Sequence, residues 1–140
     1  MAYLATSNIF YFRGHGAKTR ISTSDGFMDI EMVNNLPVGA LSDCYLVLYG
    51  ACSTGKDGEF AQNLVNATAA RGAEFAIGFQ ISVHCNEVNI WSKAFFEELA
   101  RSRNILYAIT VADIAVIESG DESPTTNSWY VSCASQYSYV

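Results

Sequence analysis

Two short apolar runs end in glycine-flanked turns that carry a reactive side chain. Residues 46–49, Leu-Val-Leu-Tyr, run into Gly-Ala-Cys, which places Cys52 in a turn after a predicted strand. Residues 9–13 run in the same way into Gly-His-Gly, which places His15 after a second strand. Unbroken apolar runs of this length are typical of strands covered on both faces, as in the parallel sheets of α/β proteins. The sequence therefore predicts two buried strands, one ending in a thiol and the other in an imidazole.

The two strand tips predict a common site. If the strands are parallel, both tips lie at one edge of the sheet, where α/β proteins bind their ligands. A cysteine nucleophile reacts as the thiolate, and a nearby histidine can stabilise that thiolate or accept the proton. The glycines beside the tips let backbone N–H groups approach a developing oxyanion. We expect Cys52 to be a nucleophile and His15 its proton acceptor, with the N–H groups of Gly16 and Cys52 as the oxyanion hole.

These residues also carry a family resemblance. An apolar block that ends in His-Gly, followed by one that ends in Ala-Cys, resembles the caspase-like cysteine peptidases, which include legumain, gingipain, separase and the bacterial CHAT domains. The likeness is greatest to the CHAT domains. It extends over about residues 8–120 and rests on Gly-Ala-Cys-Ser-Thr-Gly at 50–55, Gly-Ala at 72–73 before the apolar residues 75–79, and Ala-Phe-Phe-Glu-Glu-Leu at 94–99.

The resemblance implies a cysteine endopeptidase. Caspase-like peptidases cleave peptide bonds through a His-Cys dyad and an acyl-enzyme. The resemblance implies that His15 and Cys52 form this dyad here. No metal and no organic cofactor is expected, and the implied partner is a peptide or protein substrate. Caspase-like folds usually place two strand-helix units before the histidine strand, and the eight residues before it cannot supply them. We therefore expect an upstream segment or a second chain to cover the open edge of the first strand.

The pattern of the chain predicts one caspase-like (CHAT-like) domain over residues 1–140, without those N-terminal units. Strands and helices alternate, which implies a three-layer α/β/α sandwich with a mainly parallel sheet. Asn86 is expected to cap the third helix, and Glu97 and Arg101 are spaced to pair on its outer face. The predicted strands are residues 8–13, 45–49, 75–80 and 128–133, the predicted helices are 29–35, 58–71, 86–101 and 104–118, and a hairpin is predicted within 19–30.

Composition excludes two classes of partner. The chain has 8 basic against 14 acidic residues and a net charge of −6, so no basic surface is available for nucleic acid. No apolar run reaches the roughly 18 residues of a membrane span. These features favour a soluble protein, or a soluble piece of one, and a cytoplasmic location.

The cysteines leave one alternative open. A zinc site could use His15, Cys52, His84 and Cys85, but no Cys-x-x-Cys pair is present. Adjacent residues such as His84 and Cys85 point in different directions along an extended chain, which disfavours shared ligation. We therefore expect no metal and four free thiols, which are Cys44, Cys52, Cys85 and Cys133.

Substrate preference and activity have rival interpretations. The segment 80–87 is expected to leave the sheet at the reactive edge, so Gln80, Ser82 and His84 are candidate substrate-binding residues. For each of them taken singly, a solvated loop residue is the more common interpretation. An inactive CHAT-like interaction or regulatory module is one alternative function. Another is a different thiol-dependent acyl transfer enzyme, because the same nucleophile and oxyanion hole serve any acyl transfer.

Overall fold

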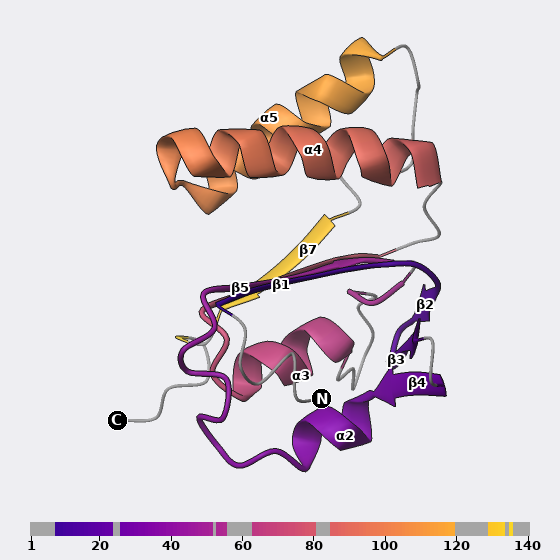
Figure 1. Cartoon of the computed structure of the whole chain (residues 1–140), viewed down its shortest axis with the longest axis vertical. Helices are drawn as coiled ribbons and strands as arrows, with labels where there is room; N and C mark the ends of the chain where they lie inside the picture. Colours follow the sequence, from indigo (N-terminus) through magenta and orange to yellow (C-terminus); the bar gives the residue numbers. More distant parts are fainter. Residues whose placement is uncertain are drawn as a thin grey trace. The chain divides into compact units, whose positions relative to one another are not determined.

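The computed structural model describes residues 8–23, 26–51, 53–55, 63–80, 85–119, 129–133 and 135. The chain divides into two compact units (Figure 1). One contains the strands and the first helices (Met1–Ile81 with Trp129–Val140), and the other contains the last two helices (Ser82–Ser128).

A four-stranded sheet forms the frame of the first unit. Its strands are β1 (Ile9–Arg13), β5 (Leu46–Gly50), β6 (Phe75–Phe79) and β7 (Trp129–Cys133), in the order β1-β5-β6-β7. β5 runs parallel to both β1 and β6, whereas β7 is antiparallel to β6. The predicted α/β fold with a mainly parallel sheet is confirmed.

The prediction that the first strand is buried is wrong. β5 is buried along its whole length, but Ile9 is 49% and Tyr11 is 40% exposed. The intervening residues Phe10 and Phe12 are half-buried against the core. Exposed and half-buried residues alternate along β1, so one face of the strand packs on the core and the other face is exposed. β1 also ends the strand order, with β5 as its only partner among the described strands.

A second, antiparallel sheet lies between β1 and β5 in the order of the chain. It contains β2 (Gly16–Ala17), β3 (Arg20–Thr23) and β4 (Gly26–Asp29), in that order. This confirms the predicted hairpin, although Asp25 of its turn lies outside the described residues. The predicted helix at 29–35 is also confirmed as α2 (Ile30–Asn34), because the Asp29 side chain caps it by accepting from the N–H of Met32 at 2.9 Å.

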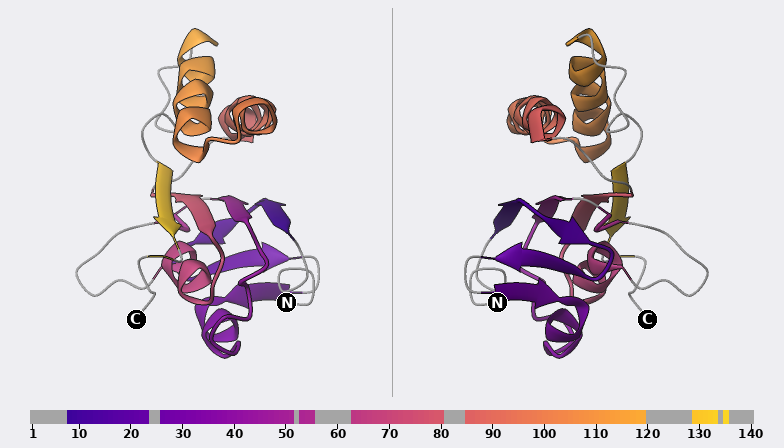
Figure 2. Two further views of the ribbon diagram at one scale, coloured as in Figure 1. Left: turned by 90° about the vertical axis from the view of Figure 1, so that its left-hand side faces the viewer. Right: turned by 90° about the vertical axis from the view of Figure 1, so that its right-hand side faces the viewer.

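Helix α3 (Leu64–Ala70) is shorter than the sequence pattern predicted. Asn63 has an extended backbone and caps the helix by accepting from the N–H of Asn66 at 2.7 Å, so the helix cannot continue back to Gly58. The buried face of α3 contacts β6 and β7. Figure 2 shows α3 and α2 on the same side of the four-stranded sheet.

The second unit is a pair of helices, α4 (Cys85–Ser102) and α5 (Ile105–Glu118), packed on each other. α4 begins one residue before Asn86, so Asn86 is not its cap. A buried hydrogen bond from Trp91 Nε1 to Asp113 Oδ1, 2.9 Å long, joins the two helices. Within the described ranges, no helix combines the length and apolar character needed to cross a bilayer.

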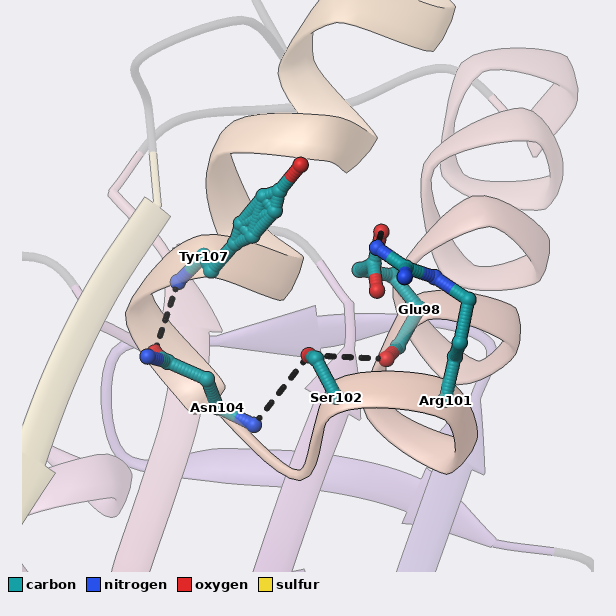
Figure 3. Close-up of polar contacts among 5 residues, drawn as sticks. All are labelled: Glu98, Arg101, Ser102, Asn104 and Tyr107. Atoms are coloured by element: carbon teal, nitrogen blue, oxygen red, sulfur yellow. Dashed lines mark hydrogen bonds and ion pairs between the residues drawn. The ribbon is translucent and has the colours of Figure 1, made fainter.

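Side-chain caps form the corner between α4 and α5 (Figure 3). Ser102 Oγ donates to the carbonyl of Glu98, and the Asn104 side chain caps α5 by accepting from the N–H of Tyr107 at 3.0 Å. Arg101 pairs with Glu98 at 2.6 Å rather than with the predicted Glu97. Both spacings bring side chains together on a helix, and Glu98 is the carboxylate that faces the corner.

The strand that leads to the cysteine turn is tied to α3 by a buried hydroxyl pair. Tyr49 Oη lies 2.8 Å from Thr68 Oγ1, and Thr68 Oγ1 donates to the Leu64 carbonyl at 2.7 Å. A hydroxyl has one proton, so Tyr49 is the donor to Thr68. Complete burial raises the pKa of Tyr49, which keeps the phenol protonated.

This arrangement predicts unequal costs for removing the two hydroxyls. Tyr49→Phe leaves Thr68 bonded to Leu64 and should cost about 1 kcal/mol in the free energy of unfolding. Thr68→Val leaves the buried Tyr49 hydroxyl without its acceptor and should cost about 1–3 kcal/mol, and more than Tyr49→Phe. Urea unfolding of both variants measures the difference, with Thr68→Ser as the control that keeps the hydroxyl. Equal stability of Thr68→Val and the parent chain would contradict this assignment.

Candidate active site

The parallel pairing of β1 with β5 aligns the two predicted reactive tips. Ile9 pairs with Leu46 and Arg13 with Gly50, a constant separation of 37 positions. Beyond the paired residues, the N–H of Gly14 donates to the carbonyl of Gly50 at 3.4 Å. The segments that follow β1 and β5 therefore stay side by side as they leave the sheet. The segments that lead to His15 and Cys52 therefore leave the same edge of the sheet in adjacent positions.

The loop that carries His15 is held by its backbone, while its side chain is exposed. The carbonyl of His15 accepts from the N–H of Ser22 at 2.9 Å. His15 and Ser22 thus form a hydrogen-bonded pair, and pairs alternate along antiparallel strands. The next pair, Gly16 with Ile21, is then of the non-hydrogen-bonded kind, in which the N–H of Gly16 points away from β3. That direction suits the predicted role of Gly16 as an oxyanion donor.

The turn after β5 is fixed on both sides of Cys52, which itself lies outside the described residues. Before it, Ala51 is buried. After it, Ser53 has φ +59°, a left-handed conformation that is uncommon for a residue with a side chain. Thr54 follows and is completely buried, with its Oγ1 donating to the Ala51 carbonyl at 3.2 Å. This side-chain bond spans the position of the predicted nucleophile.

Two adjacent N–H groups at the start of α3 connect the two halves of the candidate site. The N–H of Leu64 donates to the carbonyl of Lys18, in the β2–β3 turn, at 2.9 Å. The N–H of Val65 donates to the carbonyl of Thr54 at 3.4 Å. The first N–H groups of any helix lack partners within the helix, and here the histidine hairpin and the cysteine turn accept from them.

Of the candidate substrate-binding residues, only Gln80 lies in the described part of the chain. It follows β6, which is parallel to β5, and it is half-buried. Its position is therefore at the same edge of the sheet as His15. Ser82 and His84 lie outside the described residues.

The described thiols are suited to packing rather than to chemistry. Cys44 and Cys133 are both free. Burial raises the pKa of the Cys44 thiol. Burial, with a smaller contribution from the negative charge of Glu74, likewise raises the pKa of Cys133. A raised pKa lowers the thiolate fraction near neutral pH, so both thiols should react slowly with alkylating agents.

No group of three or more His, Cys, Asp or Glu side chains within the described residues could hold a metal ion. The zinc alternative depends on Cys52 and His84, which lie outside those ranges, and on Cys85, whose side chain is not described.

Sequence reasoning did not assign roles to Thr54 and Gly78. A Cβ at Gly78 would lie 2.7 Å from Val65 Cγ2 and would collide with Thr54 Oγ1. The strand β6 therefore needs glycine at this position so that Thr54 and the first turn of α3 can approach it. The only signal in the sequence is a glycine inside an apolar strand, which indicates close approach but does not identify the neighbour.

Comparison with known proteins places this arrangement in a known fold. No family model matches the sequence, and no curated protein matches it. Solved structures do match. A structure described as a protease has a TM-score of 0.71 and 17% identity, with 93% of this chain and 35% of the other covered. The Arg-specific cysteine proteinase gingipain R has a TM-score of 0.71 and 14% identity, with coverage of 93% and 33%.

A third matching structure is the complex of the pro- and mature domains of Porphyromonas gingivalis RgpB, with a TM-score of 0.75 and 15% identity over 93% of this chain and 33% of that one. The chain thus has the α/β fold of caspase-like proteinases and spans about a third of the length of the structures it matches. The broader resemblance is confirmed at the level of the fold. The narrower likeness to CHAT domains stays a prediction.

The contact between Gly78 and the cysteine turn can be tested by overpacking. Gly78→Ala should cost about 1–3 kcal/mol in the free energy of unfolding, because the new methyl displaces Thr54 or Val65. Val65→Ala makes room on one side, so the double variant should be less destabilised than the sum of the two single variants. Denaturant melts of the four proteins measure this coupling. Strict additivity, or a Gly78→Ala variant as stable as the parent, would rule the contact out.

Proposed function

We propose that the chain is a cysteine endopeptidase domain in which Cys52 is the nucleophile and His15 is the general base and acid. The observation that carries the proposal is the β1–β5 register. Paired residues are 37 positions apart, and His15 and Cys52 are separated by the same number. Each is the second residue after the last paired residue of its strand, so a continued register brings the two residues opposite each other.

The proposed chemistry follows from these positions. His15 accepts the thiol proton of Cys52, and the thiolate sulfur attacks the carbonyl carbon of the scissile peptide bond. The N–H groups of Gly16 and Cys52 stabilise the oxyanion. The C–N bond then breaks, and His15 gives its proton to the leaving amine. Water, deprotonated by His15, attacks the thioester, the C–S bond breaks to release the acid product, and His15 returns the proton to the sulfur. Gln80, which follows β6, is proposed to contact substrate at this edge. Ser82 and His84, which lie outside the described residues, are also proposed as substrate-binding residues.

Intact-protein mass spectrometry tests this proposal. The chain is treated with peptidyl acyloxymethyl ketones that carry Arg, Lys, Asp, Asn or Leu before the warhead. A single adduct should form, disappear in Cys52→Ala and persist in the matched controls Cys44→Ala and Cys133→Ala. His15→Ala should slow its formation about 100-fold or more, because general acid-base catalysis is typically worth that much.

An adduct that persists in Cys52→Ala would overturn the assignment of the nucleophile. A wild-type chain that reacts no faster than a free cysteine would overturn the peptidase proposal and favour the interaction module. The member of the panel that reacts fastest would identify the side chain preferred before the cleaved bond.

The exposed edge of β1 supports a further part of the proposal, a covering strand. Ile9 and Tyr11 are apolar and exposed on an edge strand, and the only charged residue of β1 is Arg13, at the end of the strand. The solved structures that match are about three times as long as this chain, and one of them is a complex of pro- and mature domains. We propose that an upstream segment or a second chain pairs with β1.

Without a covering strand, the chain should associate through this edge. Light scattering over a range of concentrations should show self-association, and Tyr11→Lys should weaken it, because an added charge opposes edge-to-edge pairing. Val38→Lys makes a similar change at an exposed apolar residue in a loop and should have no effect. A stable monomer at every concentration, with or without Tyr11→Lys, would contradict the proposal.

A further inference from the structure

We infer that Thr54 is a positioning residue that orients one donor of the oxyanion hole. This inference rests on the proposed function. Thr54 is a polar residue with no exposed surface, two positions after the proposed nucleophile. Its hydroxyl donates to the carbonyl of Ala51 at 3.2 Å. The acceptor is therefore the carbonyl of the residue directly before Cys52.

The carbonyl of Ala51 and the N–H of Cys52 belong to one peptide group. Such a group is planar and almost always trans, so its C=O and N–H point in opposite directions. A bond that fixes the carbonyl of Ala51 also fixes the direction in which the N–H of Cys52 points. Accepting a hydrogen bond at the carbonyl also polarises the peptide group, which strengthens its N–H as a donor. Thr54 thereby acts on the oxyanion hole without contacting the substrate.

Thr54 can hold this peptide because its own position is fixed by two other elements. Its carbonyl accepts from the N–H of Val65, at the start of α3. The next residue, Gly55, donates its N–H to the carbonyl of Phe79, at the end of β6, at 3.1 Å. Gly78 leaves the space that the Thr54 hydroxyl occupies beside β6. The position of the Thr54 hydroxyl is therefore fixed by contacts to both α3 and β6.

The left-handed conformation of Ser53 explains why the turn needs such a support. A residue with a side chain in this region is strained and stays there only where its surroundings impose it. The bond from Thr54 to Ala51 closes the turn across Cys52 and Ser53. Packing alone would not require a hydroxyl, because valine has nearly the same shape as threonine. The hydroxyl is thus the group to test.

Two reactions of the same thiol separate this role from general support of the turn. Hydrolysis of a fluorogenic peptidyl amide, carrying the side chain preferred in the ketone panel, needs an oxyanion hole. Alkylation of Cys52 by iodoacetamide displaces iodide from a saturated carbon and forms no oxyanion. Thr54→Val should lower kcat/KM for the amide about 10- to 100-fold, since loss of a whole donor costs about 100- to 1,000-fold. It should leave the alkylation rate within about twofold, because the thiolate itself is not changed.

Thr54→Ser is the matched control, because it keeps the hydroxyl and should retain most of the amide hydrolysis. Equal kcat/KM in Thr54→Val and the parent chain would overturn the inference. A parallel fall in hydrolysis and alkylation would also overturn it, because Thr54 would then support the whole turn or the thiolate.

A second measurement does not depend on activity. The amide ¹⁵N shift of Cys52 reports hydrogen bonding at the preceding carbonyl, so it should change in Thr54→Val and return in Thr54→Ser. If the parent chain hydrolyses no peptide, the proposed function fails and the shift still decides the bond from Thr54. A shift that is the same in all three proteins would overturn the inference even in an active peptidase.

Discussion

The parallel pairing of β1 with β5 is the constraint on which the candidate site depends. Its register sets which residue of the histidine loop stands beside which residue of the cysteine turn. A shift by one residue would move each side chain to the other face of the sheet. The pairing is stabilised unequally, because β5 is completely buried while β1 keeps alternate residues exposed. The site is therefore built on one rigid strand and one edge strand.

Helix α3 compensates for the weaker side of this pairing. Its first two N–H groups have no acceptor within the helix, and they donate to the carbonyls of Lys18 and Thr54 instead. The histidine hairpin and the cysteine turn are thus attached to the same turn of helix, independently of β1. At its other end α3 is held by Arg71, whose Nη2 donates to the carbonyl of Asn34 at 2.7 Å. One short helix therefore links the hairpin, the cysteine turn and α2.

The sequence predicted the elements well where the signal was local. Apolar runs predict the strands before His15 and Cys52, which are β1 and β5. The helix predicted at 29–35 is present as α2, and the helix predicted at 104–118 from the spacing of its apolar residues is present as α5. Predictions failed where the outcome depended on distant residues. The helix expected from Gly58 begins only after Asn63, whose side chain caps it. The burial expected for β1 is incomplete because only one face of the strand packs on the core.

By itself, the sequence determined the residue types at the two strand tips, their order and their separation along the chain, because these are covalent facts. It also determined the alternation of strands and helices, since apolar period and capping act within a few residues. Only the tertiary structure decided that the separation along the chain equals the register between β1 and β5. It also decided that Thr54 reaches the Ala51 carbonyl in the space left by Gly78. The register and the approach of Gly78 to Thr54 arise from hydrogen bonds and packing between segments far apart in the chain, which no local pattern contains.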